Sequence, residues 1–194
     1  AALRAIPHLF VIRPADPAEV AEAWRIAILR RHAPTALALT RQKVGLIDRT
    51  RFAKAEGTRR GGYILAEASE VESPKSKVPG PQLILIATGS EVSLALEARE
   101  KLQSEGIATR VVSLPCVELF EEQPQAYRDE VLPPSVTARL AIEAGVRQGW
   151  DRYVGPQGDV ICLDRFGASA PGDVAMRELG FNVENVLQHA RALI

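Results

Sequence analysis

A strand, a turn and a helix follow one another between Leu83 and Gly106, and this unit limits the fold more than any other part of the sequence. Leu83–Ile86 is a continuous apolar run, typical of a strand buried on both faces of a parallel sheet. Ser90 is placed to cap the following helix, and Gly106 to end it. Along that helix the apolar and charged residues fall on different faces: Val92, Ala95, Leu96 and Leu102 on one, and Glu91, Glu97, Glu100 and Lys101 largely on the other. The unit predicts an α/β fold.

Further strands and helices alternate through residues 61–194. The predicted strands are Tyr63–Ala66, Ala108–Leu114, Thr137–Glu143 and Val160–Phe166. The predicted helices are Gln123–Val131, a short one near Trp150, Gly172–Leu179 and Val183–Leu193. Such alternation favours right-handed crossovers and a mostly parallel sheet, so we expect a three-layer α/β domain over residues 61–194.

The first 41 residues predict a single βαβ unit. A short strand at Leu9–Ile12 is followed by a helix with Asp16 as N-cap, and then by an apolar strand at Thr35–Leu39. Val20, Trp24 and Ile28 recur on one face of that helix. Because so few residues cannot cover both faces of their own sheet, we expect this unit to be the last piece of a larger α/β domain, with part of its helix left without a core.

Two segments lack a sustained period. Residues 42–60 predict a linker that runs over the surface, with basic residues in excess of acidic ones. Residues 73–81, rich in proline and lysine, predict a loop that joins two strands of one domain.

Composition narrows the classes of function. Lysine plus arginine equals aspartate plus glutamate, at 24 each, so no net field attracts nucleic acid or an anionic membrane. No apolar run approaches the roughly 20 residues of a membrane span, and the first ten residues lack a signal-peptide layout. Cys116 and Cys162 form no disulfide framework and are expected to be buried, reduced thiols. We therefore expect a cytoplasmic protein.

Arg41 is the strongest candidate for a functional residue. It follows the predicted strand Thr35–Leu39, and the carboxyl ends of parallel strands are where α/β folds place ligands. A guanidinium group there has the planar donor geometry that suits phosphate oxygens. From the residues alone, a phosphate contact and a surface ion pair both remain open.

The other candidates have simpler structural explanations. Thr88–Ser90 places backbone N–H groups at a helix N-terminus, which can bind an anion, but one glycine is far short of a phosphate-binding motif. Gly167–Pro171 imitates the start of a nucleophile elbow around Ser169, yet it ends in proline and is expected to be a packing loop. The three histidines, at positions 8, 32 and 189, show no metal-binding spacing.

Four motifs in order resemble one enzyme family. ATGSEVSLALEA, VVSLPC, AYRDEVLPPSVTARLAIEAG and FGASAP are similar to the C-terminal region of transketolases, and the similarity extends through nearly the whole chain. It implies the end of a pyrimidine-binding domain in residues 1–41 and the transketolase C-terminal domain in residues 61–194. It also implies that Arg41, in the motif LTRQ, binds the terminal phosphate of the sugar.

The resemblance carries further expectations about the parent enzyme. Transketolases are cytoplasmic homodimers of the pentose phosphate pathway that transfer a two-carbon ketol unit from a ketose phosphate to an aldose phosphate. They use thiamine diphosphate with Mg²⁺ or Ca²⁺, held in part by a GDG motif that Gln157–Val160 does not match. The resemblance implies that the cofactor, metal and catalytic residues lie outside this chain, which alone is then expected to be inactive.

Two alternatives stay open at this point. Related thiamine enzymes, such as deoxyxylulose phosphate synthase or dihydroxyacetone synthase, have a similar layout. The chain could also act as a non-catalytic module for dimerisation or effector binding.

Overall fold

The structure is a computed structural model that describes residues 1–68 and 80–194. Most of the loop predicted at 73–81 lies outside these residues. Among the described helices, none combines the length and the apolar character that crossing a membrane requires.

The described part of residues 61–194 is built on a five-stranded sheet, as the α/β prediction requires. In spatial order the strands are β3 (Tyr63–Ala66), β5 (Thr109–Ser113), β4 (Leu83–Ala87), β6 (Arg139–Ile142) and β7 (Asp159–Ile161). Neighbouring strands are parallel, except that β3 runs antiparallel to β5. The connection from β4 leads to β5 on one side of β4, and the connection from β5 leads to β6 on the other side. The direction in which strands are added to the sheet therefore reverses between β4 and β6.

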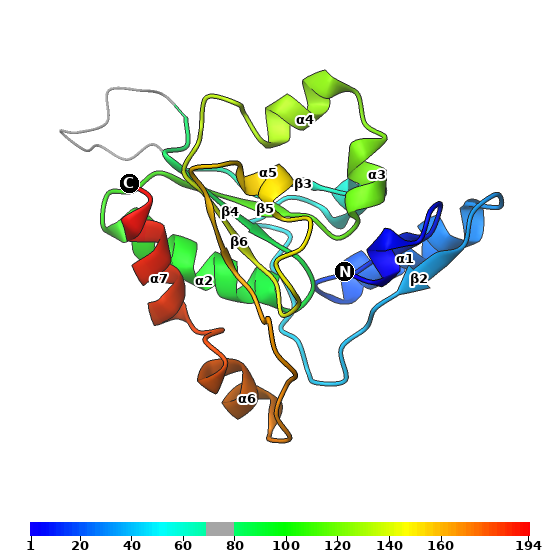
Figure 1. The fold of residues 1–194 in the computed structure, drawn as a ribbon. Coiled ribbons are helices and arrows are strands. Elements are labelled where there is room, and N and C mark those ends of the chain that lie inside the picture. Colours follow the sequence, from blue (N-terminus) through cyan, green and yellow to red (C-terminus); the bar gives the residue numbers. More distant parts are fainter. Residues whose placement is uncertain (69–79) are drawn as a thin grey trace.

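Helices cover both faces of this sheet and make three layers (Figure 1). On one face lie α2 (Glu91–Ser104) and α7 (Val183–Ala192), and on the other lie α3 (Val117–Glu121), α4 (Gln125–Val131) and α5 (Asp151–Val154). Side chains of β4 alternate between two clusters: Leu83 and Leu85 pack with α2 and α7, whereas Ile84 and Ile86 pack with Phe120 and Trp150. The run Leu83–Ile86 is therefore buried on both faces, as predicted.

Helix α2 differs from its prediction at its start. Val92, Ala95, Leu96 and Leu102 are buried as expected, and Gly106 has the predicted positive φ of 85°. However, Ser90 makes no capping hydrogen bond, because its backbone is already helical after the turn at Gly89. The prediction for Glu91 is also wrong: this carboxylate is buried.

The chain leaves the sheet earlier at β7 than the apolar run Val160–Phe166 predicts. Beyond Ile161 the amide of Leu163 bonds to the carbonyl of Gly145, and β7 has no second neighbour strand among the described residues to hold the segment in the sheet. Phe166 is 96% exposed on the way to α6 (Gly172–Glu178). Helix α3 lies between the predicted strand Ala108–Leu114 and the predicted helix Gln123–Val131, and it was not predicted.

Residues 1–41 form the predicted βαβ unit. A short 3₁₀ turn, η1 (Leu3–Ala5), precedes β1 (Phe10–Ile12), α1 (Pro17–Leu29) and β2 (Thr35–Leu37), and β1 and β2 pair in parallel. The Asp16 carboxylate caps α1 by accepting from the amide of Glu19 at 2.9 Å. This unit lies beside α3, where Phe10 and Ile12 share a buried cluster with Leu119 (Figure 1).

One face of α1 has little to pack against. Trp24 is 54% exposed and Ile28 is 71% exposed, and Val20 is half-buried. The helix is held instead by Ala23 and by Glu19, which are fully buried. The expectation that this apolar face lacks a core within the chain is met at Trp24 and Ile28.

The segment between the two units is partly buried, so its prediction as a surface connection is wrong in part. It contains the 3₁₀ helix η2 (Ala55–Arg60), whose Thr58 has no solvent exposure. Ile47 is also buried, and its amide donates to the Asp16 carboxylate at 3.3 Å. The apolar residues of this segment follow no regular period, so the sequence pattern did not predict their burial.

We expect residues 1–60 of this chain to exchange amide hydrogens faster than residues 83–194. The strands β1 and β2 have three residues each, and the outer face of α1 is exposed, so opening this unit breaks fewer buried contacts. Hydrogen exchange read by mass spectrometry on a demonstrated monomer measures the difference. Equal protection in the two regions would contradict it.

Candidate functional site

Arg41 lies beyond the carboxyl end of β2, on an exposed bend. Because β2 ends at Leu37 rather than at Leu39, three residues lie between the strand and the arginine instead of one. Within the described residues its side chain makes no hydrogen bond or ion pair, so the guanidinium group faces solvent. The surface ion pair that the sequence left open is not formed in this structure.

A small cavity lies between the Arg41 segment and the C-terminal unit. It measures about 270 Å³, and the neighbours of Arg41 on both sides, Thr40 and Gln42, line it. Its opposite wall comes from the β4–α2 turn at Gly89 and Ser90, and from Met176 of α6. The cavity is smaller than typical small-molecule pockets of about 300–1,000 Å³, so by itself it holds no more than part of a ligand.

The turn Thr88–Ser90 is occupied by the chain itself. The amide of Gly89 donates to the backbone carbonyl of Arg13 at 3.0 Å, and the Thr88 hydroxyl donates to the same oxygen at 3.3 Å. Of these two donors, the Gly89 amide belongs to the candidate anion site, which comprised the backbone N–H groups of Thr88–Ser90. Use of this amide by Arg13 leaves no free backbone donor at Gly89, so the turn serves to dock the end of β1.

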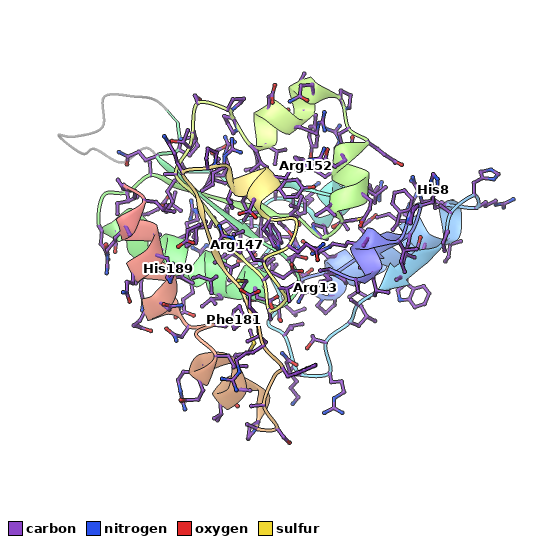
Figure 2. The ribbon with its side chains drawn as sticks, viewed as in Figure 1. His8, Arg13, Arg147, Arg152, Phe181 and His189 are labelled. Atoms are coloured by element: carbon purple, nitrogen blue, oxygen red, sulfur yellow. The ribbon has the colours of Figure 1, made fainter. Side chains whose placement is uncertain are left out.

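The Arg13 side chain fills the crevice where the strand order reverses. Its guanidinium group contacts the Glu143 carboxylate, just after β6, at 2.7 Å, and the Glu91 carboxylate, at the start of α2, at 3.2 Å. Figure 2 shows Arg13 at the inner end of the N-terminal unit, pointing toward the sheet. A crevice of this kind at the carboxyl ends of strands is where open α/β sheets bind ligands. Here an internal arginine takes that place.

The two carboxylates have further partners that satisfy their remaining oxygen sites. Glu143 also accepts from the guanidinium group of Arg4 at 2.9 Å and from the indole N–H of Trp150. Glu91 accepts from the backbone amide of Ala144 at 3.0 Å. Burial alone would raise the pKa of Glu143, but Arg4 and Arg13 outweigh it and hold that pKa below its usual value. Burial lowers the pKa of Arg13, and the Glu91 and Glu143 charges more than offset this, so it is raised.

Sequence reasoning missed this cluster, although a usable signal was present. Arg13 directly follows the predicted strand Leu9–Ile12, and Glu143 ends the predicted strand Thr137–Glu143. The rule that singled out Arg41, position at the carboxyl end of a strand, applies equally to both. What the rule could not supply is their pairing, which joins residues 130 positions apart.

A second buried cluster surrounds Glu19. Its carboxylate accepts from the Tyr63 hydroxyl at 2.7 Å, from the Ser113 hydroxyl at 2.8 Å and from the amide of Ala15 at 2.8 Å. Burial raises the pKa of Glu19 despite these bonds. Arg49 donates to Asp16 and to Tyr63, at 2.9 Å each, and so ties the segment between the units to both of them. The Nε atom of Arg49 is buried without a hydrogen-bond partner in the described residues, but the carboxylate and hydroxyl groups of the cluster bond to one another, so its role is structural.

The remaining candidates do not come together as an active site. Ser169 lies on an exposed loop and has no hydrogen-bonded histidine in the described part of the chain. His189 instead pairs with Asp159, Nδ1 to Oδ2, at 2.6 Å. Cys116 is fully buried, as expected, and burial raises its pKa, whereas Cys162 is half-buried.

The described residues do not form a metal centre. Over residues 1–68 and 80–194, no three His, Cys, Asp or Glu side chains lie together in a way that could hold a metal ion. His8 and His32 are exposed and stand apart from any such group. We therefore derive no step of chemistry through a metal from the described residues.

Comparisons with known proteins identify the family. Residues 61–182 match the model of the transketolase-like TK C-terminal domain, and residues 1–45 match that of the transketolase pyrimidine-binding domain. The first match alone covers more than half of the chain. The chain belongs to the transketolase family. Transketolases are thiamine diphosphate enzymes, and residues 1–45 match the domain that binds the pyrimidine part of this cofactor.

Individual relatives agree along the whole chain. The transketolase of Geobacillus stearothermophilus is 51% identical over all 194 residues, which make up 28% of its own length. The structure of transketolase from Leishmania mexicana superposes with a TM-score of 0.84 at 41% identity, over 99% of this chain and 26% of that one. A Pichia stipitis transketolase in complex with sedoheptulose 7-phosphate gives a TM-score of 0.84 at 35% identity, with the same coverage. The chain thus spans a little more than a quarter of the relatives that it matches.

We expect Glu143→Gln to lower the free energy of unfolding by about 1.5–3 kcal/mol at pH 7, the range for hydrogen bonds to charged groups. Because the pKa of Glu143 is lowered in the folded state, its ion pairs stabilise the fold fully above the pKa of the unfolded chain. That contribution is lost as the pH falls through the lower, folded-state pKa. Urea unfolding of the wild type and of Glu143→Gln between pH 7 and pH 3 measures the difference in their free energies of unfolding at each pH.

The matched control is Glu100→Gln, which removes a half-exposed carboxylate paired with the exposed Arg51. We expect it to change the free energy of unfolding by less than about 1 kcal/mol. If the difference in free energy of unfolding between the wild type and Glu143→Gln stays constant down to pH 3, the carboxylate charge does not stabilise this junction.

Proposed function

We propose that this chain is the C-terminal portion of a transketolase, which transfers a two-carbon ketol unit from a ketose phosphate to an aldose phosphate in the pentose phosphate pathway. The observation that carries the proposal is 51% identity to a named transketolase over every residue of the chain. The proteins reported above are transketolases, so the related thiamine enzymes are not proposed.

In the proposed enzyme, thiamine diphosphate supplies the carbanion chemistry when it is bound with Mg²⁺ or Ca²⁺. The residues that hold it belong to the part of the enzyme outside this chain. We further propose that the enzyme is a cytoplasmic homodimer, with residues 1–41 as the end of the pyrimidine-binding domain, 42–60 as the linker and 61–194 as the C-terminal domain. Sedimentation or light scattering of the full-length protein tests the dimer.

Within this chain, we propose that Arg41 binds the terminal phosphate of the sugar. Two arginines lie at the carboxyl edge of the β1–β2 pair, and their surroundings differ. Arg13 is buried between two carboxylates, whereas Arg41 is exposed and has no acidic partner in the described residues. An uncompensated guanidinium group at this edge is suited to a bidentate contact with phosphate oxygens. This contact would hold the substrate at a distance from the reacting carbonyl.

We expect Arg41→Ala, in the full-length enzyme, to reduce kcat/KM for phosphorylated sugars roughly ten- to hundredfold. This corresponds to about 1.5–3 kcal/mol, the range for hydrogen bonds to charged groups. The loss should be small for hydroxypyruvate, a donor without phosphate, because that substrate has nothing for Arg41 to bind. Steady-state kinetics with both donors in wild type and variant measures the difference.

The control variant is Arg51→Ala, which removes another exposed arginine, one that already pairs with Glu100. It should leave both donors unaffected. If Arg41→Ala lowers kcat/KM equally for the two donors, Arg41 is a structural residue and the assignment is wrong.

We expect this chain alone to be inactive, since the proposal places the cofactor ligands and the catalytic residues elsewhere in the enzyme. The assay supplies thiamine diphosphate, magnesium, a xylulose phosphate donor and a ribose phosphate acceptor. Full-length enzyme in the same assay is the positive control. Ketol transfer above background by a homogeneous preparation of the chain would contradict this division of the residues.

A further inference from the structure

A cavity of about 610 Å³ opens at the junction between the N-terminal unit and α3. Its walls come from the end of α1, from the turns that precede β1 and β2, from η2 and from α3. Because β1 and β2 run parallel, their amino ends lie at the edge opposite to the one that carries Arg13 and Arg41. Figure 2 shows His8 at the outer end of this unit, far from Arg13. The cavity is therefore separate from the proposed substrate site.

The lining of this basic groove is strongly positive. Its positive charge comes from four arginines, Arg25, Arg30, Arg31 and Arg59, and the exposed side chains of His8 and His32 also line it. Its acidic lining is Glu122, which pairs with Arg30. Glu22, which lies outside the lining, pairs with Arg59 at 2.5 Å. The positive charge of the groove thus exceeds the negative charge around it.

Part of this charge has a simpler explanation, which does not account for the rest. Arg30, Arg31 and His32 follow the last turn of α1, where the helix dipole favours cations. Arg59, however, comes from η2 and does not belong to that helix end. Segments far apart in the sequence converge on one cavity, so the dipole of α1 alone does not explain the groove.

Some of the polar groups that line the groove lack partners. Arg31, His8 and His32 make no hydrogen bond or ion pair to any residue in 1–68 or 80–194. The guanidinium group of Arg30 stacks on the Phe10 ring, 3.5 Å from its centroid, and its Nε atom is buried without a hydrogen-bond partner in the described residues. Desolvation without full compensation is unfavourable for a cation, so an anion bound beside it would be stabilised.

Apolar side chains form the other part of the lining. Leu119 is buried at the floor, and Leu29 and Ala33 lie on the α1 side. The volume falls within the range of about 300–1,000 Å³ that is usual for small-molecule sites. Guanidinium groups beside an apolar wall suit a ligand with phosphate groups and an organic body.

We propose that this basic groove binds a small effector that carries two or more phosphate groups. Two sources share this chemistry, a nucleotide and a sugar bisphosphate. More than one phosphate is required because the arginines come from separate segments of the wall, the end of α1 and η2, and no single phosphate would engage them all. The site lies at the edge opposite to Arg41, so its ligand acts as an effector and not as a substrate.

The test is direct titration calorimetry on the full-length protein with thiamine diphosphate at saturation, so that the pyrophosphate site of the cofactor is filled. The probes are inorganic phosphate, inorganic pyrophosphate, ADP and fructose 1,6-bisphosphate. We expect pyrophosphate to bind at least tenfold tighter than phosphate. Tighter binding of ADP would assign the nucleotide source, and tighter binding of fructose 1,6-bisphosphate would assign the sugar source.

Substitutions then locate the binding. Arg31→Gln, at an exposed side chain, should weaken pyrophosphate binding about tenfold, the low end for losing one hydrogen-bonded charge. Arg25→Gln combined with Arg31→Gln should weaken it further. Arg51→Gln is the matched exposed control, and Arg41→Ala removes the proposed substrate contact. Both should bind as wild type does.

The proposal is overturned if none of the multiply phosphorylated probes binds saturably, or if Arg31→Gln and Arg51→Gln bind pyrophosphate equally well. An equal loss in Arg41→Ala would place the ligand in the substrate site and overturn it as well. The titration does not depend on ketol transfer, so failure of this inference and failure of the proposed activity are separate results.

Discussion

The junction between the two units depends on one buried cation, Arg13. A guanidinium group can be withdrawn from water only where carboxylates and hydrogen-bond acceptors replace its solvation, and Glu91 and Glu143 do this. Those carboxylates require donors of their own, which Arg4, Trp150 and the amide of Ala144 supply. The positions of η1, β1, α2, β6 and α5 are therefore coupled through one residue, and loss of any partner leaves a buried charge without compensation.

This arrangement uses the ligand-binding crevice of the five-stranded sheet for assembly. The backbone donors of the β4–α2 turn bind the carbonyl of Arg13, and the carboxyl ends of β4 and β6 enclose its side chain. Groups that remain free for ligands are consequently found on the N-terminal unit. Arg41 lies at one edge of the β1–β2 pair and the basic groove lies at the other.

The sequence predicted well what depends on local pattern. The run Leu83–Ile86, the apolar face of α2 and the cap at Asp16 follow from periodicity and from side-chain chemistry, and the structure contains all three. The errors concern residues whose environment comes from distant segments. Glu91 is buried because Arg13 reaches it from another unit, and Ile47 is buried against residues more than thirty positions away. The place of Arg41 after β2 was predictable, but its lack of an acidic partner required the structure.

The segment that joins the two units also limits how they can move. Ile47 and Arg49 bond to Asp16, Arg49 bonds to Tyr63, and Thr58 is buried, so this connection is attached at several points along its length. A swing of one unit about the other would have to break these contacts and expose the Glu19 carboxyl in the same step. Motion on the timescale of a catalytic cycle is therefore expected within the exposed loops at either edge, while the two units turn together as one rigid body.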